Sequence, residues 1–390
     1  MSDSPTVMFV LGTRPEAVKL APVIHAARSY DDWRVRVCST GQHRELLAPF
    51  LDTFAIAPDE DLGLMVPGQG LGALLGSVIA QIERVLVRER PAWIVVQGDT
   101  TTVLGASLAA AGQGVAVAHV EAGLRTHDRS APFPEETNRV LVGQLAAMHL
   151  CPSLRAIENL RNEGIDDGLV LCGNTVVDAV RWIRARLPAD GVPEIREQLP
   201  RLRDGARLVL VTGHRRESFD GGLANVCAAL GELARRHPEI DIVYPVHLNP
   251  HVRAEVDRSL GGMTNVHVCP PVGYPASISL IGRAHFVITD SGGIQEEAPE
   301  LGKPVLVTRI ATERPEAVEI GAAQVVGYDR ELLLSWCERW LADPTEYARA
   351  VATKNPFGDG LAATRCIAAL RGALRLPHAV VPPFDATLRA

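Results

Sequence analysis

One stretch of the sequence, residues 287–297 (VITDSGGIQEE), strongly limits what this chain can fold into. An apolar strand ends at Thr289, a tight turn with two glycines follows, and Ser291 is suited to cap the helix that begins there. The first amides of a helix have no partner inside it, and Gly292 and Gly293 lack the Cβ that would keep a ligand away. The stretch therefore predicts a phosphate site, although an ordinary strand-to-helix turn uses the same residues.

Two carboxylates, Glu296 and Glu297, lie just inside the same helix. They would repel a phosphate, but carboxylate oxygens accept hydrogen bonds and therefore suit the vicinal hydroxyls of a ribose. A phosphate site beside a ribose site predicts that the ligand of this stretch is a nucleoside diphosphate.

The composition limits which partners the chain can have. Its 390 residues are 47% hydrophobic and 22% charged, as in a soluble globular protein of two domains. The formal net charge of −7 offers a polyanion no general attraction, so we expect no nucleic-acid partner and a phosphate site built locally. Seven scattered cysteines without a C-x-x-C pair argue against disulfides and a zinc site. Because there is no basic leader and no apolar run of about 18 residues, we expect a cytoplasmic protein without a membrane partner.

Strand-like apolar runs alternate with helical stretches along the chain, which is typical of a parallel sheet. In the first half these runs are residues 6–11, 34–39, 93–97 and 115–120, and in the second half 207–212, 241–246, 265–268, 285–289 and 304–308. The pattern predicts an α/β fold of two doubly wound, Rossmann-like domains that face each other across a cleft. The segment 186–205, rich in proline, glycine and charge, indicates a boundary region. We expect an N-terminal domain at 1–173, a C-terminal domain at 174–360, and a helix and tail at 361–390 that pack back on the N-terminal domain.

Polar residues directly after the strands of the first half carry the candidate chemistry, because open α/β sheets bind ligands at the carboxyl ends of their strands. Asp99 follows the third apolar run and Glu121 the fourth, although Asp99 is also a candidate N-cap of the next helix. Glu135 and Arg139 are four residues apart and share a helix face, whereas Glu136 is expected to point elsewhere. The Glu135–Arg139 pair is therefore either an ordinary surface ion pair or part of the site.

The first helix begins with the capping-box spacing of Thr13 and Glu16, directly after a glycine turn. Arg14 and Lys19 lie near this turn, where they can meet an anionic oxygen. Basic residues in a first helix are equally often only solvated, so both interpretations stay open for these two.

Other basic and amide side chains follow strands in both halves. His214 and Arg215 come after the first strand of the second half, and an arginine fork matches phosphate oxygens, so we interpret them as a diphosphate clamp. His247 follows the next strand and is either a second such group or a capping residue. Gln42 and His43 follow the second strand of the first half.

A series of motifs occurs in order across residues 8–320, namely GTRPEAVKLAP, GQH, GDTTT, HVEAGLRT, PEETNR, GNTVVD, GHRRES, YPVHLNP, TDSGGIQEEAP and TERPE. Together they resemble the non-hydrolysing UDP-N-acetylglucosamine 2-epimerase family. The resemblance implies the GT-B architecture and the interconversion of UDP-GlcNAc and UDP-ManNAc without a nicotinamide cofactor or a metal. It also implies a homodimer and a role in the biosynthesis of surface polysaccharide or related amino sugars.

The resemblance implies a reaction in two steps. A base removes the proton from C2 of the sugar while UDP leaves from C1, which gives 2-acetamidoglucal held beside UDP. UDP then adds back while C2 is protonated on the opposite face, and the result is the epimer. Both faces of the sugar need an acid–base group, which explains the need for more than one carboxylate and leaves open which of them serves which face.

The resemblance also implies roles for individual residues. The candidates for proton transfer are Asp99, Glu121 and Glu135. Those that stabilise the diphosphate or orient these carboxylates are Arg14, Lys19, Arg139 and His214, the last counted with the catalytic set. The residues that bind the nucleotide are Ser291, Gly292 and Gly293 at the β-phosphate, Glu297 at the ribose and Arg314 at the edge of the site. The candidate allosteric residues are Gln42, His43, Arg215 and His247.

The sequence departs from the family pattern at a few positions. Ser277 stands where the family carries an aromatic residue that stacks on the uracil, so we expect weaker nucleotide binding or a relaxed choice of base unless Tyr274 substitutes for it. Glu45 and Gln69 stand where members activated by a second UDP-GlcNAc carry glutamine and arginine, which argues against such activation here. Phe133 replaces a common tryptophan, and we expect this change to be mild.

Other functions use parts of the same pattern. A hydrolysing 2-epimerase would release UDP and free ManNAc, but the opening motif GTRPE favours the non-hydrolysing branch. A GT-B glycosyltransferase would need an acceptor pocket, and the carboxylates at 99, 121 and 135 argue against it. A non-catalytic sensor of nucleotide sugars would not require those carboxylates.

Overall fold

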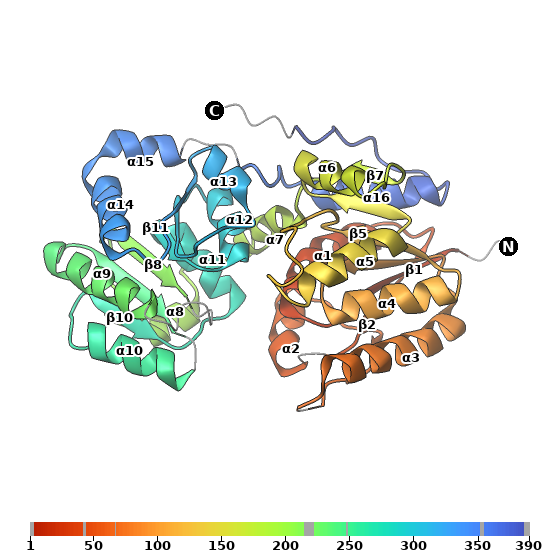
Figure 1. Cartoon of the computed structure of the whole chain (residues 1–390), viewed down its shortest axis with the longest axis horizontal. Helices are drawn as coiled ribbons and strands as arrows, with labels where there is room; N and C mark the ends of the chain where they lie inside the picture. The colour runs from red at the N-terminus through yellow and green to blue at the C-terminus, as the bar shows by residue number, and fades with distance from the viewer. Residues whose placement is uncertain are drawn as a thin grey trace. The chain divides into compact units, whose positions relative to one another are not determined.

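The computed structural model describes residues 4–41, 44–66, 68–213, 222–246, 249–351 and 355–385. The elements of this part of the chain form two units, each a sheet with helices around it (Figure 1). Unit 1 contains Met1–Arg181 and the segment Phe357–Ala386, and unit 2 contains Trp182–Pro356. The chain passes from unit 1 to unit 2 within helix α7 (Thr175–Arg184).

The sheet of unit 1 has seven strands in the order β3-β2-β1-β4-β5-β6-β7, with parallel pairing between neighbours. The strands are β1 (Thr6–Leu11), β2 (Arg34–Ser39), β3 (Glu60–Asp61), β4 (Trp93–Gln97), β5 (Ala116–Val120), β6 (Met148–Cys151) and β7 (Leu169–Leu171). The strand order reverses between β1 and β4, and doubly wound sheets bind ligands at such a point. All the strands expected in the first half are present, and β3, β6 and β7 extend the sheet at its two edges.

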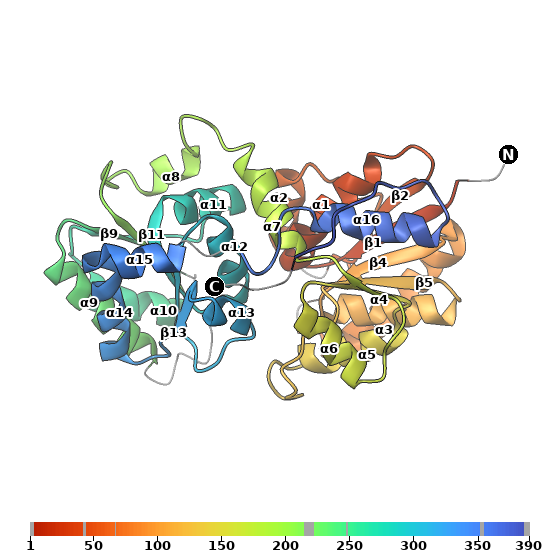
Figure 2. The ribbon, with the colours of Figure 1, turned by 90° about the horizontal axis from the view of Figure 1, so that it is seen from above.

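Helices cover both faces of this sheet (Figure 2). Helices α3, α4 and α5 lie side by side on one face, and α1 and α16 pack together on the other. The helices of unit 1 are α1 (Arg14–Arg28), α2 (Arg44–Thr53), α3 (Leu71–Glu89), α4 (Thr101–Gly112), α5 (Glu135–Leu145), α6 (Leu154–Asn162) and α16 (Ala362–Ala373), with α7 leading out. In the core below α3 and α4, Met8 and Val10 of β1 pack with Val78, Ile82 and Val103.

The sheet of unit 2 has six strands in the order β10-β9-β8-β11-β12-β13, again with parallel neighbours. The strands are β8 (Leu208–Thr212), β9 (Asp241–Pro245), β10 (Val266–Cys269), β11 (Ala284–Thr289), β12 (Val305–Val307) and β13 (Ala323–Val325). The order reverses between β8 and β11, as it does between β1 and β4 in unit 1. Only β13 lies outside the strands expected in the second half, and it forms one edge.

The helices of unit 2 are α8 (Pro193–Gln198), α9 (Gly222–Arg236), α10 (Pro250–Leu260), α11 (Tyr274–Arg283), α12 (Gly292–Glu300), α13 (Pro315–Glu319), α14 (Arg330–Ala342) and α15 (Pro344–Val351). Leu230 of α9 and Trp340 of α14 share a core with β8 and β11, and the Trp340 ring meets Phe286 edge-on at a centroid distance of 5.6 Å. Among the described helices of both units, none is long and apolar enough to cross a membrane.

The central strands are mainly apolar, as expected of strands whose two faces are both covered by helices. All six residues of β1 are buried, and in β11 only His285 is partly exposed. This is why the strands appear in the sequence as continuous apolar runs rather than as alternating patterns. The prediction of an α/β fold with two Rossmann-like domains is confirmed for each unit.

The last helix of the chain belongs to unit 1. The Asp178 carboxylate of α7 accepts hydrogen bonds from the amides of Ala362 and Ala363 at 3.3 and 3.0 Å, and it thereby caps α16. The Arg371 guanidinium of α16 forms two hydrogen bonds to Asp32, at 2.6 and 2.7 Å. These contacts fasten the end of the chain to the part of unit 1 that is synthesised first.

Candidate active site

In unit 1, polar side chains gather at the carboxyl ends of β1, β4 and β5, which are neighbours in the sheet. Glu16 and Lys19 come from α1 after β1, Asp99 from the turn after β4, and Glu121 from the turn after β5. This is the edge at which the strand order reverses. The local geometry of these residues therefore decides what chemistry unit 1 can perform.

Glu121 is held by three side chains from other elements. Lys19 forms an ion pair with Oε1, Gln97 donates a hydrogen bond to Oε2, and Asn174 donates to Oε1 at 3.3 Å. The backbone of Glu121 has a φ of 64°, a conformation that costs a non-glycine residue free energy and is enriched at functional sites. A buried carboxylate with a cation and two amide donors around it is fixed in orientation.

Asp99 is fixed by the first residues of α5. Its Oδ2 accepts hydrogen bonds from Nε and Nη2 of Arg139 at 3.0 and 2.5 Å, and its carbonyl oxygen accepts one from Asn138 at 2.8 Å. The Arg139 side chain is buried, whereas about a quarter of the Asp99 side chain (24%) is exposed and accessible to a ligand. The N-cap of α4 is Thr100, whose hydroxyl accepts from the amide of Val103, so the alternative that Asp99 caps this helix is wrong.

The helix face that pairs with Arg139 differs from the predicted one. Arg139 contacts Glu136, three residues before it, at 3.0 Å, and Glu136 is buried and also accepts the amides of Thr126 and His127. Glu135 is only half-buried, so the expectation that Glu136 points away and that Glu135 forms the pair is wrong. The reason is the phase of α5, whose buried positions include Glu136, Arg139 and Val142 at three-residue spacing.

Glu16 belongs to this group of polar residues, although the sequence indicated it only as a helix cap. Its Oε2 accepts the amides of Gly12 and of Thr13, the latter at 2.8 Å, and its Oε1 accepts the hydroxyl of Thr100. The residue is 1% exposed, and burial raises the pKa of its carboxyl to about 7. Capping-box spacing predicted the contact with Thr13, but no local signal indicated Thr100, which is 84 positions away.

A buried histidine fixes the residue before Asp99. Nε2 of His119 lies 2.7 Å from the carbonyl oxygen of Gly98, and since a carbonyl only accepts, this nitrogen carries the proton and donates. Burial lowers the pKa of His119 to about 3, so the imidazole is neutral at physiological pH. Gly98 has a φ of 79°, which glycine adopts without strain.

The remaining basic candidate of unit 1 differs from Lys19 in its surroundings. Arg14 is exposed at the first position of α1, and its guanidinium lies 5.8 Å from the centroid of the Phe50 ring. Lys19 is buried against Glu121. The two roles predicted for these basic residues were to stabilise the diphosphate and to orient the carboxylates. In the structure Lys19 and Arg139 contact carboxylates, whereas Arg14 stays accessible to a ligand.

In unit 2, the predicted phosphate site lies at the junction of β11 and α12. Ser291 is the N-cap of α12 with extended backbone, and Gly292 and Gly293 are the first two residues of the helix. The prediction that Ser291 is the N-cap is confirmed, although its hydroxyl makes no capping hydrogen bond. Among the described residues, a Cβ added to Gly292 would have only the tip of Arg314 nearby, at 3.8 Å, so this part of the chain leaves the first amide open.

The two carboxylates of α12 have different partners. Glu296 is buried and forms an ion pair with Nε of Arg314, whose guanidinium therefore lies beside the helix start. Glu297 accepts a hydrogen bond at 3.0 Å from the hydroxyl of Tyr274, the first residue of α11. Tyr274 is buried and Ser277 is half-buried. The burial of Tyr274 argues against the idea that its ring replaces the one that stacks on the base, and that idea stays a prediction.

Several predicted residues lie outside the described part of the chain. They are Gln42, His43, His214, Arg215 and His247. Of the two positions that argued against activation by a second nucleotide sugar, Gln69 is described, and its Oε1 accepts the amide of Val66 at 3.3 Å. Phe133 is 66% exposed.

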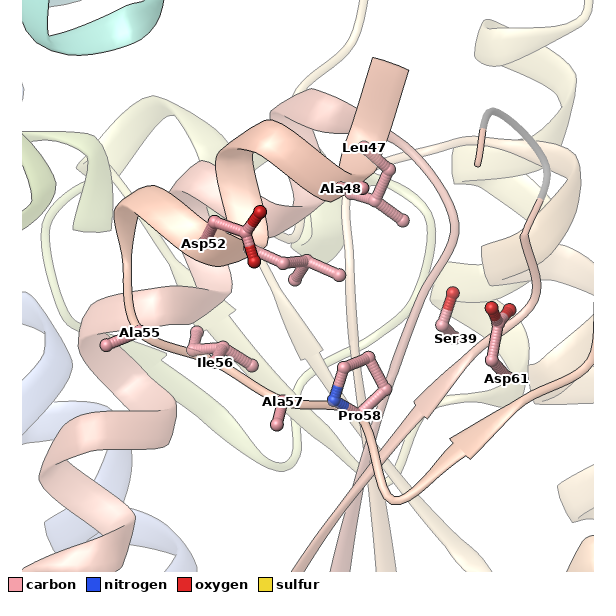
Figure 3. A pocket seen from close by; sticks show the side chains of 10 residues that line it. Ser39, Leu47, Ala48, Asp52, Ala55, Ile56, Ala57, Pro58 and Asp61 are labelled. Atoms are coloured by element: carbon pink, nitrogen blue, oxygen red, sulfur yellow. The ribbon is translucent and has the colours of Figure 1, made fainter. Parts of the chain in front are cut away.

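A pocket of about 560 Å³ lies between α2 and the ends of β2 and β3 (Figure 3). Its lining is mainly apolar, and its charged side chains are Asp52 on the helix and Asp61 on the strand side. Among the described residues that line it, none is basic. Since two carboxylates repel a phosphate, the described lining of this pocket does not favour a phosphate group.

Comparisons with known proteins agree with this geometry. Residues 25–371 match the family described as UDP-N-acetylglucosamine 2-epimerase. A UDP-N-acetylglucosamine 2-epimerase of Yersinia pestis is 46% identical over 370 residues, which cover 94% of this chain and 98% of that protein. The crystal structure of UDP-GlcNAc 2-epimerase from Neisseria meningitidis bound to UDP-GlcNAc matches with a TM-score of 0.87 and 39% identity, over 94% of this chain and 100% of that one. The S. aureus MnaA–UDP co-structure matches with a TM-score of 0.86 and 35% identity, over 97% and 100%.

The two doubly wound sheets and their structural neighbours define a protein of the GT-B class with two Rossmann-like domains. The chain belongs to the UDP-N-acetylglucosamine 2-epimerase family. The resemblance seen in the sequence motifs is thereby confirmed at the level of the family.

Proposed function

We propose that this protein is a non-hydrolysing epimerase that interconverts UDP-GlcNAc and UDP-ManNAc by inversion at C2. The observation that carries the proposal is the fixed pair of carboxylates after β4 and β5, in a chain whose family acts on this nucleotide sugar. Asp99 and Glu121 are each held in one orientation by a buried cation, and a group that reacts with a single carbon atom needs such a fixed position.

In the proposed reaction, a carboxylate takes the proton from C2, the electron pair of that bond forms the C1–C2 double bond, and the C1–O bond breaks with its electrons on UDP. The products of this step are 2-acetamidoglucal and UDP. UDP then attacks C1 while C2 receives a proton on the opposite face. The proton-transfer groups are Asp99, Glu121 and Glu135, and His214 assists the diphosphate.

Unit 2 supports the proposal through its open helix start. The amides of Gly292 and Gly293, at the positive end of α12, bind the β-phosphate together with Ser291. Glu297 binds the ribose hydroxyls, and Arg314, held by Glu296, lies at the edge of this site. A leaving group bound in this way is stabilised as its charge develops, which lowers the barrier for loss of the C2 proton.

The test is proton NMR of the purified protein with UDP-GlcNAc in D₂O. We expect UDP-ManNAc to appear with deuterium at C2, because the reaction removes that proton and returns one from solvent. Accumulation of UDP and free ManNAc would instead assign the protein to the hydrolysing branch. Absence of turnover with both UDP-GlcNAc and UDP-ManNAc would mean that the substrate is a different sugar, and Ser277 would be the first position to change.

We further propose that the protein acts in the cytoplasm as a homodimer and that its product feeds the biosynthesis of surface polysaccharide or related amino sugars. Sedimentation at several protein concentrations tests the dimer. A single monomeric species throughout would contradict it.

A further inference from the structure

The turn between β4 and α4, residues 97–100, is held by side chains from several elements of unit 1. The Gly98 carbonyl accepts from His119, and the Asp99 carbonyl accepts from Asn138. The Thr100 hydroxyl donates to Glu16 and accepts from the amide of Val103. The orientation of the Asp99 carboxylate therefore depends on contacts made by its neighbours as well as on Arg139.

Glu16 is the member of this set that connects two turns. Its Oε2 takes the amides of Gly12 and Thr13 after β1, and its Oε1 takes the Thr100 hydroxyl after β4. β1 and β4 are the strands between which the sheet order reverses. One carboxylate thus ties together the two turns that border the point where a ligand binds in such a sheet.

An ordinary helix cap does not need this environment. A capping glutamate is normally solvated, whereas Glu16 is 1% exposed, and among the described residues no lysine or arginine pairs with it. Burying a carboxylate without a cation costs free energy, and its hydrogen bonds offset only part of that cost. Such a group is expected where a fixed geometry matters more than stability.

We propose that Glu16 is a positioning residue for Asp99: its carboxylate holds Thr100, and through Thr100 the turn that carries Asp99, in the geometry needed for proton transfer. The proposal rests on the function proposed above, and it assigns Glu16 no contact with the sugar or with UDP. A displacement of about 1 Å at a reacting group lowers the rate about a hundredfold, so loss of this contact acts on kcat.

The chemistry of the contact provides a test that separates positioning from proton transfer. In the variant Glu16→Gln, the amide oxygen can still accept from Gly12 and Thr13, and the amide nitrogen can donate to Thr100 in place of the reverse bond. In Glu16→Ala both contacts are lost. A positioning residue is therefore rescued by glutamine, whereas a residue that transfers a proton is not.

The experiment measures kcat and KM for UDP-GlcNAc, and the affinity for UDP, in both variants. We expect Glu16→Ala to lose about ten- to a hundredfold in kcat. We expect Glu16→Gln to stay within about fivefold of the unchanged protein, and UDP affinity to change less than about twofold in both. Full kcat in Glu16→Ala would overturn the proposal, and so would a loss in Glu16→Gln as large as that in Glu16→Ala.

A second pair of variants keeps the test decisive if Glu16→Ala does not fold. Thr100→Val removes the hydroxyl with little change of shape and should lower kcat as Glu16→Ala does, whereas Thr100→Ser keeps the hydroxyl and should not. If Thr100→Val and Thr100→Ser have equal kcat, the contact has no positioning role.

Amide hydrogen exchange separates failure of this proposal from failure of the proposed function. The amides of Gly12, Thr13 and Val103 should exchange faster in Glu16→Ala than in Glu16→Gln, with or without turnover. Unchanged exchange at all three amides would overturn the proposed positioning contact of Glu16 with Thr100, even in an active enzyme. A second outcome is that the unchanged protein turns over no UDP-GlcNAc while amide exchange in the variants changes as expected. The proposed function then fails, but the positioning contact of Glu16 with Thr100 is supported.

Discussion

The β1–α1 turn of unit 1 and the β11–α12 turn of unit 2 are built alike but have opposite capacities for an anion. Each joins a buried strand to a helix, with a hydroxyl residue at the N-cap and glycine next to it. In unit 1 the third helical residue is Glu16, whose carboxylate occupies the amides of Gly12 and Thr13. In unit 2 the third residue is Ile294, and the two before it are glycines.

The comparison suggests a rule: the N-terminus of a helix can bind a phosphate only if no side chain of the protein already occupies the amides there. The positive end of α1 is already neutralised by a carboxylate of its own first turn, so a phosphate there would meet repulsion. At α12 the carboxylates lie one turn further in, where Arg314 and Tyr274 hold them. The proposed function therefore gives the two turns different roles: the first orders the carboxylates of unit 1, and the second receives the phosphate.

The largest expected effect comes from removing a proton-accepting carboxylate of unit 1 while leaving unit 2 unchanged. The variant Glu121→Gln keeps its shape but cannot take a proton, so kcat should fall about 10²- to 10⁴-fold while UDP affinity stays within about twofold. Steady-state kinetics and titration calorimetry with UDP measure the two quantities. Glu158→Gln, on the exposed face of α6, is the matched control and should change neither. Equal loss of UDP affinity in Glu121→Gln would contradict the division of roles.

The next effect comes from closing the open turn with a methyl group. In Gly292→Ala the new Cβ clashes with none of the residues that the structure describes, because its nearest neighbour among them is the tip of Arg314 at 3.8 Å. It fills the space of a bound phosphate, so UDP affinity should fall about ten- to a hundredfold with little change in thermal stability. Gly282→Ala in α11, where a Cβ also meets open space, is the control. Unaltered UDP binding in Gly292→Ala would place the phosphate elsewhere.

A smaller effect should follow from copying the unit 1 arrangement into unit 2. Ile294→Glu places a carboxylate at the third helical position, where it repels a phosphate at the helix start. We expect UDP affinity to fall about tenfold, and the loss to shrink at high salt because the residue is half-exposed. Ile294→Gln, uncharged and of the same length, is the control. If both variants bind UDP equally, charge at this position does not distinguish the two turns.

The smallest expected effect is the dependence of protein stability on pH that results from burying Glu16 in the β1–α1 turn. Burial raises the pKa of Glu16 from 4.5 to about 7, so between these values the folded state binds more protons than the unfolded state. The free energy of unfolding contributed by this group therefore decreases as the pH rises through this window. Relative to Glu16→Gln, the unchanged protein should lose about 1 kcal/mol between pH 5.5 and 6.5, measured by urea denaturation. A difference that stays constant with pH would show that Glu16 does not titrate there.

The sequence predicted most of the fold because the central strands are buried on both faces and so appear as continuous apolar runs. The strands it missed are short or polar, as in β3, which consists of Glu60 and Asp61, or β7, which has three residues. Strand pairing at a sheet edge is a property of the assembled fold, and two or three residues carry too weak a local pattern to indicate it.

Within the site, local signals predicted single residues better than their partners. Asp99 and Glu121 follow apolar runs and were found in this way. Sequence could not decide whether Glu135 or Glu136 pairs with Arg139, because spacings of four and of three residues both place two side chains on the same helix face. The choice depends on which side of α5 packs on the sheet. The contact of Glu16 with Thr100 joins positions 84 apart, which only the pairing of β1 with β4 brings together.

The attachment of α16 to unit 1 has a consequence for how the protein is made. Because Phe357–Ala386 belongs to unit 1 and Trp182–Pro356 lies between its two parts, unit 2 is in effect an insertion within unit 1. A ribosome therefore releases all of unit 2 before it releases the helix that completes unit 1, and unit 2 is free to fold first. Termination before Phe357 would leave α1 without α16 and would therefore damage unit 1. The missing residues nevertheless lie at the opposite end of the chain from α1.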